Sequence, residues 1–100
     1  PIKLLMNVIY YECHITIDPF ENEDQRNFVA HLVAENGFRV AKLIMEKNGP
    51  ESTEDAFMSA RDISFADLNY RANQTVQTLQ TYGVKVRRCK IEGIIRDERY

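Results

Sequence analysis

The chain has 100 residues, which is enough for one hydrophobic core and too few for a second. Hydrophobic residues make up 44% of the sequence and charged residues 28%, and this balance excludes a disordered chain. The formal net charge of -2 provides no overall field that would attract nucleic acid or an anionic membrane, so the sequence argues against both as partners.

The first predicted element is a strand over residues 7–18. Its odd-numbered positions from Ile9 to Ile17 are apolar or aromatic, and its even-numbered positions are mostly polar. This alternation is typical of a strand that turns one face toward a core. The pair Asp18-Pro19 ends the strand, because proline cannot donate a hydrogen bond to a neighbouring strand.

A helix, a strand, a loop and another strand follow in chain order. Residues 21–36 begin with acidic side chains, continue with apolar residues at helical spacing and end before Gly37, which predicts a helix. Residues 38–45 are rich in β-branched and apolar side chains and predict a strand. The polar stretch 46–55 contains a Gly-Pro break and predicts a loop, and AFMSARD at 56–62 predicts a short strand.

The last two elements are a second helix and a final strand. Ser64 and Asp67 form a capping-box pattern, with Asp in place of Glu, that opens a helix over residues 64–82 with a glycine after it. The final strand covers residues 84–95. Its apolar positions change parity along the strand, which predicts a β-bulge near residues 87–88.

The order strand, helix, strand, strand, helix, strand is the split βαβ pattern of ferredoxin-like domains. We therefore expect an α+β protein with a ferredoxin-like βαββαβ fold, in which a four-stranded antiparallel sheet has both helices on one face and leaves the other face open. The first and third strands would be central, and the fourth would flank the first. The side chains predicted to fill the core are Ile15, Ile17, Phe28, Leu32, Phe65, Leu68 and Leu79.

Polar side chains form a row on the open face of the first strand. If the apolar positions face the helices, Glu12, His14 and Thr16 point the other way. Neighbouring strands would add a hydroxyl and cations, from Ser59, Arg61, Arg88 and Lys90. Cations and hydroxyls hold phosphate oxygens while a histidine moves a proton, so this face suits an anion. Antiparallel sheets often have one solvent-exposed face, and such a face would have the same row of polar side chains without binding a ligand.

The stretch CHITI resembles the His-x-Thr-x-hydrophobic motif of the two-histidine phosphoesterases, the family of RNA ligase-like and cyclic phosphodiesterase enzymes. In that family each of two pseudo-symmetric lobes contributes one motif, the histidines act as general acid and base, and the threonines hold phosphate. The resemblance implies that His14 and Thr16 are catalytic and fill one half of such a site. The sequence has no second motif, because the other histidine, His31, has no threonine two positions on, and we expect it to be exposed on its helix.

A second resemblance covers nearly the whole chain. The first strand has the pattern tyrosine, Glu, x, His, hydrophobic, Thr, and it is followed by a helix ending in NGF and by strands with the sequences KLIM, FMSARD and VRRCKIE. This arrangement resembles a group of small uncharacterised proteins of bacteria and their phages. This resemblance implies the same layout and a shared polar sheet face, and it implies no activity.

Two functions are consistent with these observations, and the sequence leaves open whether the protein is an enzyme. The first is a non-enzymatic binding or interaction module that uses its open sheet face, with a second copy of the chain or a phosphate-containing small molecule as partner. The second is a phosphoesterase-like or nucleotide-binding protein with one HxT motif per chain, in which a symmetric dimer would bring two copies of His14 together. Arg87, Arg88 and Lys90, with Tyr10, also form a basic patch for nucleic acid, but the flanking acidic residues argue against that partner.

The cysteines and the chain ends give further expectations. Cys13 and Cys89 have no spacing typical of a metal site or a disulfide framework, so we expect both to be reduced and buried on adjacent strands. No metal site and no cofactor is predicted. No apolar run approaches the ~20 residues of a membrane span, and the first residues lack a signal-peptide pattern. We therefore expect a cytoplasmic protein with a single domain over residues 1–100, in which residues 1–5 are a candidate N-terminal extension.

Overall fold

The computed structural model describes residues 8–41 and 55–95 of the chain. Within these ranges the elements are β1 (Val8–Ile17), α1 (Glu23–Ala34), β2 (Arg39–Val40), β3 (Ala56–Asp62), α3 (Phe65–Thr81) and β4 (Val86–Ile95). Every expected helix and strand is present, although only the start of the strand expected at 38–45 falls within the described residues. The expectations for residues 1–5, 42–45 and 46–54 lie outside them.

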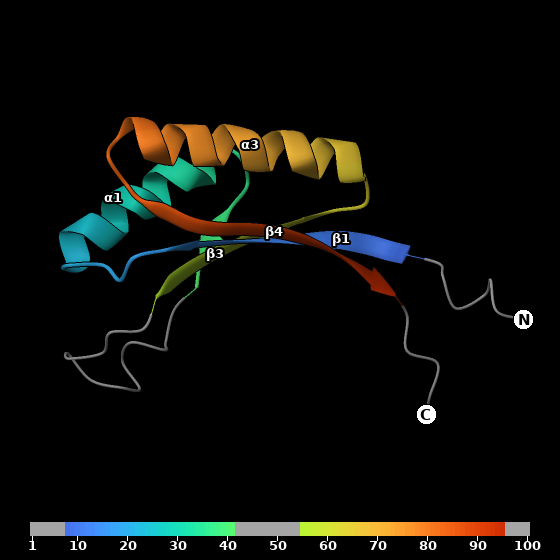
Figure 1. The fold of residues 1–100 in the computed structure, drawn as a ribbon, viewed down its shortest axis with the longest axis horizontal. Helices are drawn as coiled ribbons and strands as arrows, with labels where there is room; N and C mark the ends of the chain where they lie inside the picture. The colour runs from blue at the N-terminus through green and yellow to red at the C-terminus, as the bar shows by residue number, and fades with distance from the viewer. Residues whose placement is uncertain (1–7, 42–54, 96–100) are drawn as a thin grey trace, which may run out of the picture.

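The four strands form one antiparallel sheet in the order β2-β3-β1-β4. Both helices lie over the same face of this sheet, and α3 runs along β1 and β4 (Figure 1). In the described part of the chain no helix covers the opposite face, which we call the open face. The α+β class, the antiparallel sheet, the central first and third strands and the fourth strand beside the first are confirmed. Neither described helix has the length and apolar character needed to cross a membrane.

The core lies between the sheet and the two helices. Cys13, Ile15 and Ile17 of β1 are at most 2% exposed, as the alternation of the strand predicted. Leu68 and Leu79 of α3 are fully buried against the same side of the sheet. The even-numbered positions from Tyr10 to Thr16 consequently point away from the core, to the open face.

Two aromatic residues expected in the core lie at its margin instead. Phe28 is 47% exposed and Phe65 is 50% exposed, so the expectation that both are core residues is wrong. Each ring packs edge-to-face against a tyrosine, Phe28 against Tyr82 and Phe65 against Tyr11, with ring centroids 5.5 Å apart in both pairs. Leu32 is only partly buried and is not one of the buried core residues, so that expectation is also wrong.

A β-bulge lies in β4 at the predicted place. Thr16 pairs with Arg88 and Ile17 pairs with Val86, so Arg87 is the additional residue. Because of this extra residue, Val86 packs against the core while Arg88, two positions on, lies on the open face.

A second irregularity lies near the start of β1. Val8 pairs with Ile95 and Tyr10 pairs with Ile94, which leaves Ile9 without a partner on β4. The expectation that Ile9 faces the core is wrong, because this irregularity interrupts the alternation and the side chain is 49% exposed.

Ser64 begins α3 as its N-cap. Its hydroxyl accepts a hydrogen bond from the Asp67 N–H at 3.2 Å, which confirms one half of the predicted capping box. The Ser64 N–H donates to Asp62 Oδ1 at 2.9 Å rather than to Asp67. This bond is the main reason that the pKa of Asp62 lies below its ordinary value, and the Arg71 guanidinium lowers that pKa further.

Both helices end in the same type of glycine turn. Gly37 follows α1 and Gly83 follows α3, with φ angles of +79° and +81°. In each turn the glycine N–H donates at 3.0 Å to the carbonyl three residues earlier. The next N–H donates to the carbonyl five residues before it, at 3.0 Å after α1 and 2.9 Å after α3. These are Schellman motifs, so the predicted helix stops are confirmed.

Arg71 of α3 ties the turn after α1 to the end of β3. Its Nη1 donates to the Asn36 carbonyl at 2.8 Å. Its Nη2 donates to the Arg61 carbonyl at 2.6 Å and forms an ion pair with Asp62 Oδ2 at 3.1 Å. One guanidinium thus holds the helix layer to the sheet beside the turn at Gly37.

Candidate functional site

A row of polar side chains crosses all four strands on the open face. His14 of β1 pairs with Ser59 of β3 and with Lys90 of β4, and Ser59 pairs in turn with Arg39 of β2. Residues that pair directly in antiparallel strands have their side chains on the same face. Arg39, Ser59, His14 and Lys90 therefore lie next to one another across the sheet, and we call these four residues the central row.

A further row lies on each side of the central row. Thr16 pairs with Phe57 and Arg88, and Glu12 pairs with Arg61 and Glu92. The seven residues that the sequence placed on this face thus lie together: Glu12, His14, Thr16, Ser59, Arg61, Arg88 and Lys90. Arg39 also lies on this face and was not predicted from the sequence. The alternation of the FRV stretch indicates this position, because the apolar residues on either side of the arginine face the core and the arginine must then point to the open face.

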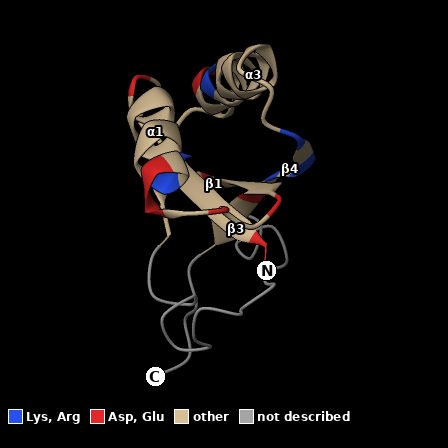
Figure 2. Ribbon diagram, turned by 90° about the vertical axis from the view of Figure 1, so that its left-hand side faces the viewer, with Lys and Arg blue, Asp and Glu red and all other residues tan. Residues whose placement is uncertain are grey.

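Ion pairs neutralise only part of the positive charge on the open face. They join Arg61 Nε to Glu12 Oε2 at 3.5 Å and Lys90 Nζ to Glu92 Oε2 at 3.3 Å. Within residues 8–41 and 55–95, no carboxylate lies within 4.0 Å of the Arg39 or Arg88 guanidinium. Figure 2 shows the basic residues of β4 as a blue segment of that strand. Among the described residues, Arg39 and Arg88 are therefore the two cations of this face that can serve an anion.

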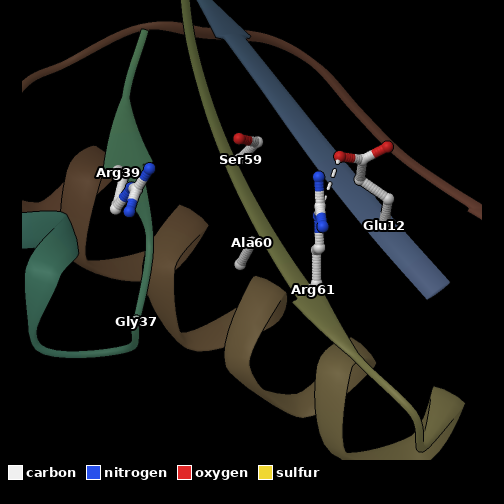
Figure 3. A pocket seen from close by; sticks show the side chains of 6 residues that line it. All are labelled: Glu12, Gly37, Arg39, Ser59, Ala60 and Arg61. Atoms are coloured by element: carbon white, nitrogen blue, oxygen red, sulfur yellow. Dashed lines mark ion pairs between the residues drawn. The ribbon is translucent and has the colours of Figure 1, made fainter. Parts of the chain in front are cut away.

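A shallow hollow of about 380 Å³ lies over the β3 side of the central row. It is lined by Glu12, Gly37, Arg39, Ser59, Ala60 and Arg61. Figure 3 shows the Ser59 side chain between Arg39 on one side and the Arg61–Glu12 ion pair on the other. The Arg61 guanidinium also lies over the Tyr10 ring, 5.1 Å from its centroid. In this hollow the Ser59 hydroxyl lies beside Arg39, whose guanidinium has no carboxylate partner among the described residues, so the two side chains can donate to an oxyanion.

His14 lies at the centre of the open face and is partly buried. No hydrogen bond joins its imidazole to another described residue, so no described side chain occupies either ring nitrogen. His31 is exposed on α1, as expected, and the sheet lies between the two histidines. One chain therefore does not bring two histidines together. No group of three or more His, Cys, Asp or Glu side chains is placed to hold a metal in the described ranges.

The two cysteines lie on the other side of the sheet, toward the helices. Cys13 is fully buried, as expected, and both cysteines are free. Cys89 is exposed, so the expectation that it is buried is wrong. The reason is its place on β4, which is an edge strand with β1 as its one neighbour in the sheet.

Comparison with known proteins adds no assignment to this site, because no family model matches the chain and no curated protein matches its sequence.

Proposed function

We propose that this protein is a non-enzymatic binding module that holds a phosphate-bearing ligand on the open face of its sheet. The observation that carries the proposal is the central row, in which Ser59 lies between Arg39 and His14 and Lys90 follows on the next strand. This set offers hydrogen-bond donors from a guanidinium, a hydroxyl, an imidazole and an ammonium group, and phosphate oxygens accept from all four.

The size of the row indicates the kind of ligand. Neighbouring strands lie about 4.8 Å apart, so the three gaps between Arg39 and Lys90 span about 14 Å. One inorganic phosphate reaches two or three of these side chains and, on an open surface, should bind with a Kd of about 1 mM or weaker. A ligand that carries a phosphate and a further polar group, such as a nucleotide, would use more of the row.

We also infer that the fold is ferredoxin-like and that the chain is related to the small bacterial and phage proteins that it resembles. The strand order β2-β3-β1-β4, with both helices on one face, supports the first inference. The sequence pattern quoted above supports the second.

A phosphoesterase is the second candidate function. His14 and Thr16 share the open face, as one HxT motif requires, and this observation favours it. The chemistry needs a second histidine, so the active species would be a symmetric dimer that joins two open faces. A dimer in solution and His14-dependent hydrolysis of a nucleoside cyclic phosphate would support this function over simple binding.

The binding proposal is tested by following the His14 ring signals by NMR while ligand is added at constant ionic strength. The probes are inorganic phosphate, a nucleoside monophosphate and a nucleoside cyclic phosphate. Arg39→Gln removes a cation of the central row. Arg87→Gln is the matched control, because Arg87 lies at the bulge and is paired with Asp18 at 3.4 Å and Asp55 at 2.8 Å.

We expect Arg39→Gln to weaken binding about tenfold, since one charge-assisted hydrogen bond contributes about 1.5 kcal/mol or more. Arg87→Gln should change the Kd by less than about twofold, as expected for an exposed cation away from the ligand. Two results would refute the proposal: no shift of the His14 signals with any probe up to about 10 mM, or equal weakening by both variants, which would indicate only diffuse attraction.

A further inference from the structure

The two cysteines are in contact across neighbouring strands. Cys13 pairs with Ile91 and Cys89 pairs with Ile15, so the two cysteines are diagonal neighbours on the face that the helices cover. Their Sγ atoms lie 3.8 Å apart, and either thiol can donate to the other. This contact lies on the opposite side of the sheet from the central row and takes no part in the proposed ligand binding.

The two sulfur atoms differ in access to solvent. Cys13 is completely buried beneath the helices, whereas Cys89 is exposed on the edge strand. The hydrogen bond from the Cys13 thiol stabilises a thiolate at Cys89 and lowers the pKa of Cys89 to about 7. The same bond, together with burial, raises the pKa of Cys13. The accessible sulfur is thus the one that ionises first.

We propose that Cys89 and Cys13 form a reactive thiol pair, in which Cys89 is oxidised by hydroperoxides and Cys13 then closes a disulfide with it. The geometry assigns the roles, because a peroxide can reach Cys89 from solvent, whereas Cys13 is in contact with Cys89 and shielded from solvent. The substrate class is a small hydroperoxide, with hydrogen peroxide as the simplest member.

The chemistry has two balanced steps. In the first, the Cys89 thiolate attacks one peroxide oxygen, the O–O bond breaks, and the leaving oxygen takes up a proton and departs as water or an alcohol. Cys89 becomes a sulfenic acid, and the peroxide is reduced by two electrons. In the second, the Cys13 thiol loses its proton and its sulfur attacks Cys89 Sγ. The S–S bond forms, the S–O bond breaks, and the hydroxyl leaves as water with the proton from Cys13.

The backbone around Cys89 can accommodate the bond. A disulfide requires the sulfur atoms at about 2.05 Å, so they must approach by about 1.8 Å from their present contact. Because β4 is an edge strand of the sheet that the described residues form and has a bulge two residues before Cys89, it can shift more readily than a central strand.

The expected gain in reactivity is moderate. Lowering the pKa from 9.0 to about 7 gives about fifty times more thiolate at neutral pH, since the fraction rises from about 1% to about one half. The less basic thiolate is also about eight times less nucleophilic, which leaves about a sixfold gain over an ordinary thiol. Wild-type Cys89 should therefore react about sixfold faster than Cys89 in Cys13→Ala, where the donor thiol is absent.

The test treats the reduced, folded protein with hydrogen peroxide and measures the intact mass without reductant. For wild type we expect a loss of about two mass units, reversed by reduction, with one cross-linked peptide containing both cysteines. Cys13→Ala should instead retain a sulfenic acid that a 1,3-diketone probe labels, and Cys89→Ser should react at least about tenfold more slowly than wild type.

Three results would overturn the proposal. They are the addition of oxygen to wild type without the loss of two hydrogens, a covalent dimer as the main product, and oxidation of Cys89→Ser at the wild-type rate. The mass measurement and Cys89→Ser need no change at the buried position, so they decide the question even if Cys13→Ala fails to fold. Circular dichroism of each variant before treatment provides the control for folding.

Discussion

Replacement of Gly37 by alanine tests how the turn after α1 is held to the rest of the fold. Gly37 has a φ of +79°, and a Cβ there would lie 2.5 Å from Nη1 of Arg71, the atom that donates to the Asn36 carbonyl. Gly83 ends α3 in the same type of turn with a φ of +81°, and a Cβ there would have no atom within 4 Å. Gly83→Ala is therefore a matched control that carries the backbone strain alone.

The magnitudes follow from these two environments. A left-handed backbone costs a non-glycine residue about 1–2 kcal/mol, so Gly83→Ala should lower the free energy of unfolding by that amount. Gly37→Ala has the same cost and also displaces the Arg71 guanidinium, which relieves the clash but breaks the hydrogen bond to Asn36. Bonds from a charged donor contribute about 1.5–3 kcal/mol, and the 25% exposure of the Arg71 side chain favours the lower end. Gly37→Ala should therefore cost about 1.5 kcal/mol more than Gly83→Ala.

Urea denaturation followed by circular dichroism measures both variants, in the wild-type background and in Arg71→Met. In Arg71→Met the guanidinium is absent, so the two glycine substitutions should have equal costs. A loss of unfolding free energy for Gly37→Ala that exceeds the loss for Gly83→Ala by less than about 0.5 kcal/mol would contradict a role of Arg71, and so would an excess that persists in the Arg71→Met background.

Three further predictions concern the core, the acid range and the thiols. Leu79→Ala should lower the free energy of unfolding by about 2–5 kcal/mol, because Leu79 is fully buried, and a loss below about 0.5 kcal/mol in urea denaturation would contradict this. The ionised carboxylate of Asp62 should stabilise the fold above pH 3.8 and lose this effect as the pH falls through its lowered pKa. Asp62→Asn should therefore have a lower free energy of unfolding than wild type at neutral pH. This prediction is wrong if the difference between the two proteins does not shrink on acidification. Alkylation of Cys89 should accelerate with rising pH with a midpoint near 7, because the thiolate is the reacting form. Cys13→Ala should move this midpoint back toward 9.0, and identical rate profiles for the two proteins would show that the thiol contact does not lower the pKa of Cys89.

The sequence by itself determined the order of the elements and the faces of β1 from Glu12 to Ile17. Side chains alternate with a period of two along a strand, so the apolar positions at Cys13, Ile15 and Ile17 already turned His14 and Thr16 to the other side. The helix ends were equally local, because a serine N-cap and a glycine with positive φ act within one turn of the helix.

Apolar composition alone did not determine which side chains became buried. Phe28 and Phe65 have the helical spacing of core residues, but burial also depends on which residues lie opposite them. Both side chains lie at the margin of the core and are about half exposed. Cys89 is exposed for a similar reason, since an edge strand has a neighbour on one side alone and is less completely covered.

The composition of the central row was decided by the tertiary structure. Arg39, Ser59 and Lys90 come from three strands far from His14 in the sequence, and they meet it only through the strand order and the register of each pair. A parity pattern states which face a residue takes within its own strand, but it contains no information about which residue of another strand lies beside it. That choice is made when the strands pair, because sliding one strand by a single residue would move its side chains to the opposite face and bury charged groups in the core.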